Sequence, residues 1–132
     1  MVLTKGVHHV GLTTQNVEET AQFFTELLGF DIVNRNPDYP AIFISDSTSM
    51  ITLWEVQDKE NYIPFDRKLN VGLHHLALRV ETLSELNDIH KTLVTYNVPI
   101  EFAPGPVGAG TAQHMIFPEP GGIRIELFKD NS

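Results

Sequence analysis

Apolar residues recur at helical spacing in two stretches of the chain. Successive positions lie three or four residues apart, which places them on one face of a helix. The pattern therefore predicts two amphipathic helices, near residues 17–28 and 83–96. The two apolar stripes consist of Val17, Ala21, Phe24 and Leu28, and of Leu83, Leu86, Ile89 and Leu93.

Both predicted helices carry matching start and stop signals. Each begins after a capping box, in which a polar N-cap residue is followed three positions later by glutamate. The first helix is expected to end at Gly29, and the second at Asn97, because these residues accept the left-handed conformation that ends many helices. The capping boxes are Asn16 with Glu19 and Thr82 with Glu85.

Short strand-like runs surround each predicted helix. A run headed by a histidine pair precedes it, "HHVGLTT" in the first half and "HHLALRV" in the second. Three further runs follow it, separated by turn-forming segments such as "NPDYP" and "PEPGG". Both halves therefore read βαβββ, and the chain is predicted to be an α+β tandem duplication. The later runs span residues 30–35, 41–45 and 49–56, and residues 99–103, 111–117 and 121–128.

The segments between these elements complete the predicted organisation. The polar residues 57–70 are the expected connector between the halves. Residues 103–110, "APGPVGAG", form a Gly/Pro-rich loop that either borders a site or only crosses the surface. We expect a single domain, residues 1–132, with modules at about 5–57 and 71–129.

Composition narrows the classes of function. No apolar run approaches the roughly 20 residues that span a bilayer, and the first ten residues lack the apolar stretch of a secretory signal. We therefore expect no membrane partner and a cytoplasmic protein. The net charge is −8 and only nine Lys and Arg are scattered along the chain, which argues against nucleic acid as a partner. The absence of cysteine excludes disulfides and a thiol nucleophile.

The histidine pairs supply candidate metal ligands. Adjacent strand residues point to opposite faces, so each pair offers one histidine to a given face. The more apolar face is expected to pack under the helices, which leaves His9 and His75 on the other face. In the last strand, alternation places Glu126 on that same face. Two imidazoles and one carboxylate are a suitable set for a divalent ion.

The internal repeat tests for a fourth ligand. Aligning "ITLW", residues 51–54, with "IELF", residues 125–128, places Thr52 opposite Glu126. The same alignment pairs Glu55 with Lys129, out of phase with the expected site. The first half is therefore predicted to lack the carboxylate that the second half supplies.

These residues resemble the vicinal oxygen chelate superfamily, which includes glyoxalase I, fosfomycin-resistance proteins, methylmalonyl-CoA epimerase, extradiol dioxygenases and bleomycin-resistance proteins. The resemblance runs from His9 to Phe128. It rests on "HVGL" at His9, Leu28-Gly29-Phe30, "HLAL" at His75, Gly105-Pro106-Val107 before Gly110-Thr111, and Glu126 in "RIELF". The usual Asp-Pro-Asp-Gly turn is replaced by Glu119-Pro120-Gly121-Gly122.

The resemblance implies two βαβββ modules whose mixed sheet curls around a metal cavity. It implies His9, His75 and Glu126 as ligands of one divalent ion (Zn, Ni, Fe, Mn or Co), and a homodimer that binds a small-molecule substrate. Glyoxalase I normally has a further Glu or Gln ligand where this chain has Thr52. The chain therefore resembles the three-ligand sites of the fosfomycin and dioxygenase types at this position.

Other residues remain open between a role in the site and a structural role. His8 and His74 are expected at the edge of the helix layer, and His90 is expected to be structural. His114 is either a substrate or acid/base group, or a satisfied structural histidine. The remaining candidates are Trp54 and Phe128, as pocket walls or core, and Arg124, as a ligand for an anionic substrate group or as the partner of an acidic side chain.

Three functions follow from this reading. The leading hypothesis is a metal-dependent, glyoxalase-I-like lyase or isomerase whose substrate chelates the metal through neighbouring oxygens. Glu126 would act as ligand and base, with His114 also catalytic and with Thr52, Trp54 and Arg124 contacting substrate. The alternatives are an Fe(II) extradiol-type dioxygenase and a metal-free ligand-binding protein.

Overall fold

The computed structural model describes all of residues 1–132, which divide into two compact units, residues 1–62 and 63–132. Each unit is described by itself. The first unit contains β1 (Val10–Thr14), α1 (Val17–Leu28), β2 (Asp31–Asn36), β3 (Ala41–Ser45) and β4 (Met50–Glu55). The second contains β5 (Leu76–Arg79), α2 (Leu83–Thr95), β6 (Phe102–Pro106), β7 (Gln113–Pro118) and β8 (Arg124–Lys129). The predicted repeat of βαβββ modules is thus confirmed.

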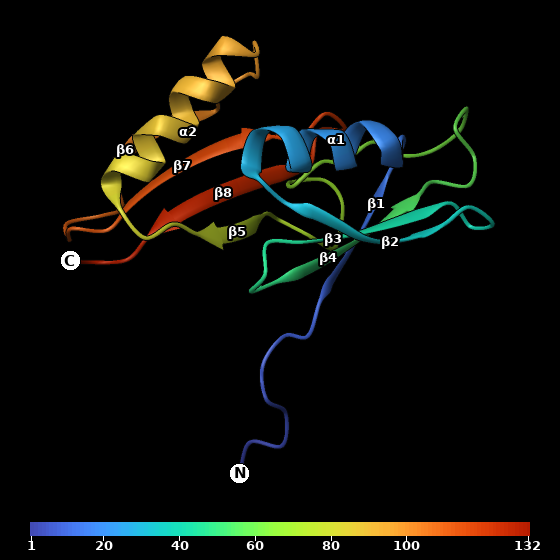
Figure 1. Ribbon diagram of the computed structural model, residues 1–132, viewed down its shortest axis with the longest axis horizontal. Coiled ribbons are helices and arrows are strands. Elements are labelled where there is room, and N and C mark those ends of the chain that lie inside the picture. Colours follow the sequence, from blue (N-terminus) through green and yellow to red (C-terminus); the bar gives the residue numbers. More distant parts are fainter. The chain divides into compact units, whose positions relative to one another are not determined.

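The two sheets share one topology. Their strand orders are β1-β4-β3-β2 and β5-β8-β7-β6. The first strand of each unit pairs in parallel with the last, and the other neighbours are antiparallel. In each unit the helix lies over one face of its own sheet (Figure 1). The opposite face of each sheet is not covered by that unit's own helix.

The helices begin and end close to where the sequence predicts. The N-cap side chains of Asn16 and Thr82 accept hydrogen bonds from the backbone N–H three residues later, at 3.0 Å in both helices. Gly29 ends α1 with φ of 76°. The left-handed residue after α2 is Asn97, with φ of 59°. Local capping chemistry therefore determines these boundaries to within a residue.

A separate apolar core lies under each helix. Phe24 of α1 is fully buried and packs edge-on against Phe30, with ring centroids 5.2 Å apart. In the second unit Leu86 and Leu93 of α2 are fully buried. Phe24, Leu86 and Leu93 belong to the predicted apolar stripes, and Phe30 lies two residues after the first stripe ends. The other fully buried apolar residues come from the inner strands, among them Ile44, Ile51, Leu53, Met115, Phe117 and Ile125.

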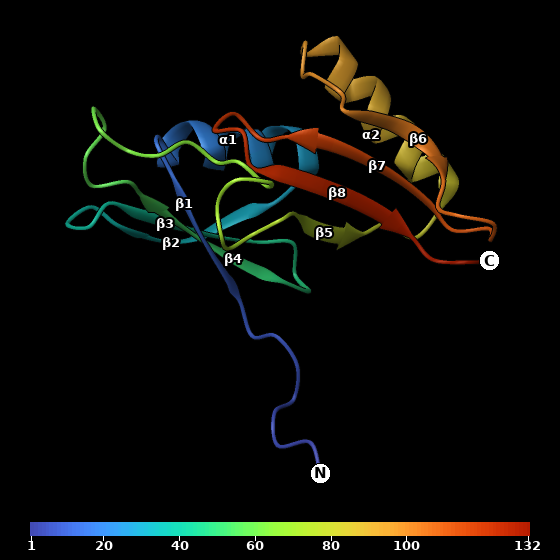
Figure 2. The ribbon, with the colours of Figure 1, turned by 180° about the vertical axis from the view of Figure 1, so that it is seen from behind.

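Several predicted strand boundaries were wrong. β7 and β8 begin at Gln113 and Arg124, later than the predicted residues 111 and 121. The opening strands begin at Val10 and Leu76, after the histidine pairs and not within them. The strand expected at residues 99–103 lies instead at 102–106, within the predicted Gly/Pro loop. The prolines are tolerated because β6 is an edge strand, where a missing N–H costs no ladder bond. A register shift between Phe102 and Gly105 accommodates the irregular backbone. Figure 2 shows β6 beside α2 at this edge.

Neither helix has the length and apolar character that a bilayer crossing requires.

Candidate metal centre

Strand register supports the alignment of the two halves. In the second unit Ala77 of β5 is the partner of Glu126 in β8. In the first unit Gly11 of β1 is the partner of Thr52 in β4. Because partners in register share a face of the sheet, Thr52 and Glu126 occupy equivalent positions. The structural repeat therefore has one carboxylate and one hydroxyl at this position.

His75 and Glu126 place two potential metal-coordinating atoms close together. The Nε2 atom of His75 lies 3.4 Å from Oε1 of Glu126, and the side chains are 38% and 11% exposed. Two ligands about 2.1 Å from one ion, at a roughly tetrahedral angle, stand about 3.4 Å apart. This pair therefore fits two ligand positions of a metal site. The structure contains no group of three or more His, Asp or Glu side chains arranged to hold a metal ion.

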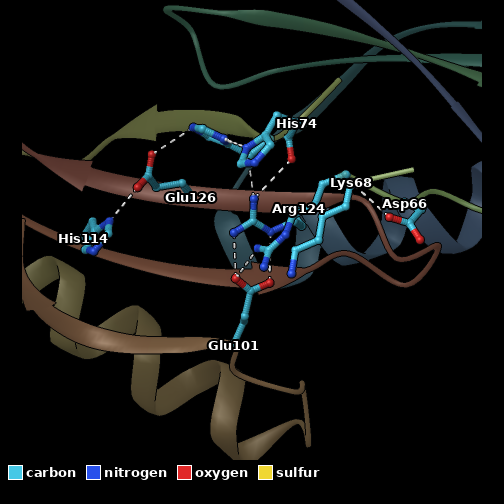
Figure 3. Close-up of polar contacts among 9 residues, drawn as sticks. Asp66, Lys68, His74, Glu101, His114, Arg124 and Glu126 are labelled. Carbon is cyan, nitrogen blue, oxygen red and sulfur yellow. Dashed lines mark hydrogen bonds and ion pairs between the residues drawn. The ribbon is translucent and has the colours of Figure 1, made fainter. Parts of the chain in front are cut away.

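His114 holds the other oxygen of the same carboxylate. Its Nδ1 lies 2.6 Å from Oε2 of Glu126, with both side chains largely buried. The imidazole also lies close to two aromatic rings, with centroids 4.7 Å away for Phe102 and 6.5 Å for Phe128. A carboxylate accepts this hydrogen bond from the ring N–H. The contact leaves Oε1 as the oxygen on the side of His75. Figure 3 shows His114 and Glu126 facing one another.

Arg124 is tied to an acidic partner. Its Nε and Nη2 donate to Oε1 and Oε2 of Glu101 at 3.0 and 2.7 Å, a bidentate pair. Arg67 donates to the same carboxylate at 2.9 Å. The hydrogen bond from Arg124, assisted by Arg67, lowers the pKa of Glu101 to about 2 against the cost of its partial desolvation. The pair with Glu101 raises the pKa of Arg124. Of the two roles open for Arg124, the structure therefore contains the pairing with an acidic side chain.

The remaining guanidinium nitrogen reaches a histidine. Nη1 of Arg124 lies 3.2 Å from Nδ1 of His74 and 3.3 Å from its carbonyl oxygen. Desolvation, followed by the charge of Arg124, lowers the pKa of His74. The same Nδ1 lies 2.8 Å from Nδ1 of His75. These contacts form a continuous polar chain in the second unit (Figure 3), through Glu101, Arg124, His74, His75, Glu126 and His114.

The first unit repeats only the histidine pair. Nδ1 of His8 lies 2.8 Å from Nδ1 of His9, and both residues are exposed. At the position of Glu126, the buried hydroxyl of Thr52 accepts a hydrogen bond from the indole of Trp54 at 2.9 Å. The Trp54 ring contacts Tyr39 and Phe43, with ring centroids at 4.7 and 5.6 Å. This unit therefore presents an aromatic cluster beside Thr52.

Glu55 serves the helix and not the face that carries Thr52. Its Oε1 accepts a hydrogen bond from the backbone N–H of Val17, the first residue of α1, at 3.2 Å. Lys59 lies 3.4 Å from the same oxygen. A carboxylate is stabilised at a helix N-terminus by the unpaired N–H groups and the helix dipole. The strand parity expected for Glu55 is accordingly the parity observed.

The sequence analysis did not identify Glu101, a member of the polar chain, or Arg67, which binds it. Glu101 lies within a predicted strand and Arg67 within the predicted connector. His74 was expected to lie at the edge of the helix layer, with no expected contact to Arg124. One sequence signal pointed to the contact between His74 and Arg124. Both halves have a histidine pair, but only the second half has an arginine at the start of its last strand.

The fold and the polar site define a two-module α+β protein with a carboxylate–imidazole cluster on a strand face. A family model described as the Glyoxalase/Bleomycin resistance protein/Dioxygenase superfamily matches residues 6–127. The chain belongs to this superfamily.

Individual relatives agree with this assignment. Metapyrocatechase from Geobacillus stearothermophilus is 30% identical over 98% of this chain, which spans only 38% of that relative's length. A glyoxylase/bleomycin resistance protein/dioxygenase domain from Frankia sp. EAN1pec superposes with a TM-score of 0.82 at 21% identity, covering 98% of this chain and 95% of the other. An integron cassette protein from the mobile metagenome of the Halifax Harbour sewage outfall is 28% identical, with a TM-score of 0.73, covering 96% and 100% of the two chains.

Proposed function

We propose that this protein is a divalent-metal-dependent enzyme of the glyoxalase-I-like lyase or isomerase type. The observation that carries the proposal is the environment of Glu126. One oxygen accepts a hydrogen bond from His114, and the other lies 3.4 Å from Nε2 of His75. His75 and Glu126 are the proposed ligands in the second unit. His9 is proposed as the third ligand on its equivalence to His75 in the internal repeat.

The donor set limits the metal and the chemistry. Two imidazoles and one carboxylate suit Zn, Ni, Fe, Mn or Co. Such an ion, when bound, stabilises negative charge on two neighbouring oxygens of a small substrate. Glu126 is the proposed base, which takes a proton from one substrate carbon and returns it to the next. The hydrogen bond from His114 holds the carboxylate in place and allows the proton to be shared between the two groups.

Substrate contacts are proposed for Thr52, Trp54 and Arg124. Trp54 and its aromatic neighbours provide an apolar surface, and the hydroxyl of Thr52 provides a polar group beside it. A direct contact of Arg124 with an anionic substrate group stays a prediction, since Glu101 and His74 engage this guanidinium in the structure.

An extradiol-type dioxygenase is the second candidate. The similarity to metapyrocatechase over 98% of the chain favours it. Thr52 favours it as well, because a threonine in place of a fourth ligand leaves open positions of the kind that O₂ chemistry uses. Oxygen consumption with catechols, compared with isomerisation of thiol–aldehyde adducts without oxygen, separates the two activities.

Metal content after native purification tests the proposal. We expect about one divalent ion per chain in protein prepared without chelator or a nickel column. The His75→Ala and Glu126→Ala variants should each lose the ion. Mutating a residue that only hydrogen-bonds a ligand lowers metal affinity roughly 10–100-fold, and removing the ligand itself should cost more. His90→Ala, on α2, is the matched control and should retain the ion. Metal-free wild-type protein that also fails to bind added metal would contradict the proposal and support a ligand-binding role.

A further inference from the structure

We propose that Arg124 and His74 are positioning residues that hold His75 with its ring proton on Nδ1 and leave Nε2 as the metal-binding atom. This inference rests on the proposed function, which requires His75 as a ligand. Neither Arg124 nor His74 touches the proposed ion. Their effect passes through hydrogen bonds to the ring of His75.

The donors and acceptors along the chain determine the proton's position. A guanidinium nitrogen only donates, and Nη1 of Arg124 lies 3.2 Å from Nδ1 of His74 and 3.3 Å from its carbonyl oxygen, so this environment favours a lone pair, and not a proton, on Nδ1 of His74. The same Nδ1 lies 2.8 Å from Nδ1 of His75. Since two acceptors cannot share a hydrogen bond, the proton between the two rings belongs to Nδ1 of His75. In a neutral ring the lone pair is then on Nε2.

The lone pair on Nε2 of His75 faces the carboxylate of Glu126. Nε2 of His75 is the atom that lies 3.4 Å from Oε1 of Glu126. The opposite tautomer would place a hydrogen there and leave no donor electrons for an ion. Ligand histidines generally depend on such a partner at their other nitrogen, which sets the tautomer and the ring orientation.

Arg124 is itself held in place by two carboxylate bonds. Arg124 is only 8% exposed, and its two hydrogen bonds to Glu101 orient the guanidinium plane. Arg67 also donates to Oε2 of this carboxylate, at 2.9 Å. Nη1 is therefore presented to His74 by a constrained group, and not by a mobile surface side chain.

The first unit provides a natural comparison. Val10 pairs with Ile51 and Leu76 pairs with Ile125, so the residue before each isoleucine is also equivalent. That residue is Met50 in the first unit, where the second has Arg124. His8 and His9 make the same 2.8 Å contact, but methionine has no N–H to donate. The inference therefore assigns a fixed tautomer to His75, and none to His9.

Ring nitrogen NMR of the metal-free protein tests the tautomer directly. At about pH 8, above the ordinary histidine pKa, we expect Nδ1 of His75 to give a protonated-type signal and Nε2 an unprotonated one. In the Arg124→Met variant, which copies the first unit, the His75 signals should move towards a tautomer mixture. A wild-type His75 protonated on Nε2 would overturn the inference.

Two variants of the exposed His74 separate positioning from folding. Asn Oδ1 occupies nearly the same place as His Nδ1 and accepts a hydrogen bond, whereas Leu cannot. We expect His74→Leu to weaken metal binding by roughly 10–100-fold and His74→Asn to remain within a few-fold of wild type. Equal affinity of wild type and His74→Leu would contradict the inference and leave the proposed function standing. A wild-type protein that binds no metal contradicts the proposed function, and the tautomer measurement still decides whether the hydrogen-bond chain exists.

Discussion

The ring of His114 and the carboxylate of Glu126 are joined by a contact of 2.6 Å between Nδ1 and Oε2. The two residues lie on neighbouring strands, twelve positions apart in the sequence. A charge-assisted hydrogen bond of this length fixes the orientation of both groups. Oε2 of Glu126 is consequently hydrogen-bonded to His114, and Oε1 remains available to bind a metal ion.

Removing the hydrogen-bond donor of His114 should weaken metal binding. His114→Phe keeps a ring between Phe102 and Phe128 but leaves the largely buried carboxylate without this partner. We expect metal affinity to fall roughly 10-fold or more, measured by calorimetric titration. His114→Asn restores a donor near Nδ1 and should recover much of the affinity, while His90→Phe serves as the control. Equal losses for the Phe and Asn variants would contradict a hydrogen-bonding role.

Glu55→Gln should lower stability and leave metal binding unchanged. The charge of Glu55 lies at the N-terminus of α1, on the N–H of Val17. Its loss should cost about 0.5 kcal/mol of unfolding free energy, measured by urea denaturation beside the control Glu60→Gln. Metal affinity equal to that of wild type is the expected second result. A loss of metal affinity as large as that of Glu126→Ala would identify Glu55 as a ligand. The three-ligand proposal would then be wrong.

Glu101 should make stability depend on acidic pH. Its folded pKa of about 2 is below the unfolded value of 4.5, so the folded state favours the charged form. This contribution is fully present above about pH 4.5 and is lost as pH falls towards about 2. Because the side chain is 39% exposed, solvent screening reduces the effect. Denaturation midpoints of wild type and Glu101→Gln should converge as the pH is lowered, and parallel curves would contradict this assignment.

Gly11→Ala should disturb the contact between Thr52 and Trp54. A Cβ at this position would lie 3.2 Å from Oγ1 of Thr52 and 3.6 Å from Nε1 of Trp54. We expect a loss of about 1 kcal/mol from overpacking and a shift in the emission of Trp54, the single tryptophan. Gly105→Ala is the control, because its nearest neighbours stand at 3.6 Å or more. Unchanged emission and stability would show that the strand absorbs the methyl group.

Light scattering should give twice the 14.8 kDa mass of the chain. This expectation comes from the resemblance to superfamily members of similar length. The measurement is made across a range of protein concentrations, with and without added divalent metal. A mass of one chain throughout that range would contradict the homodimer.

Local interactions account for what the sequence predicted well. The N-cap side chains of Asn16 and Thr82 bind backbone N–H groups three residues away, so the residues that set the helix starts are close together in the sequence. The apolar stripes identified Val17, Ala21, Phe24, Leu86 and Leu93 as buried for the same reason, but they missed Phe23 and included Leu83, which is exposed. The β6 boundary was wrong because prolines normally argue against a strand, and only the edge position of β6 removes the objection.

The sequence by itself determined the two βαβββ modules, the helix boundaries and the strand face that carries Glu126, because periodicity and capping depend on neighbours within one turn or one strand. Only the tertiary structure decided that Arg124 pairs with Glu101, twenty-three positions away, and reaches His74, fifty positions away. It also decided that His114 contacts Glu126. Such contacts depend on the register between strands and on the rotamers that packing selects, and neither is encoded in the spacing of residues along the chain.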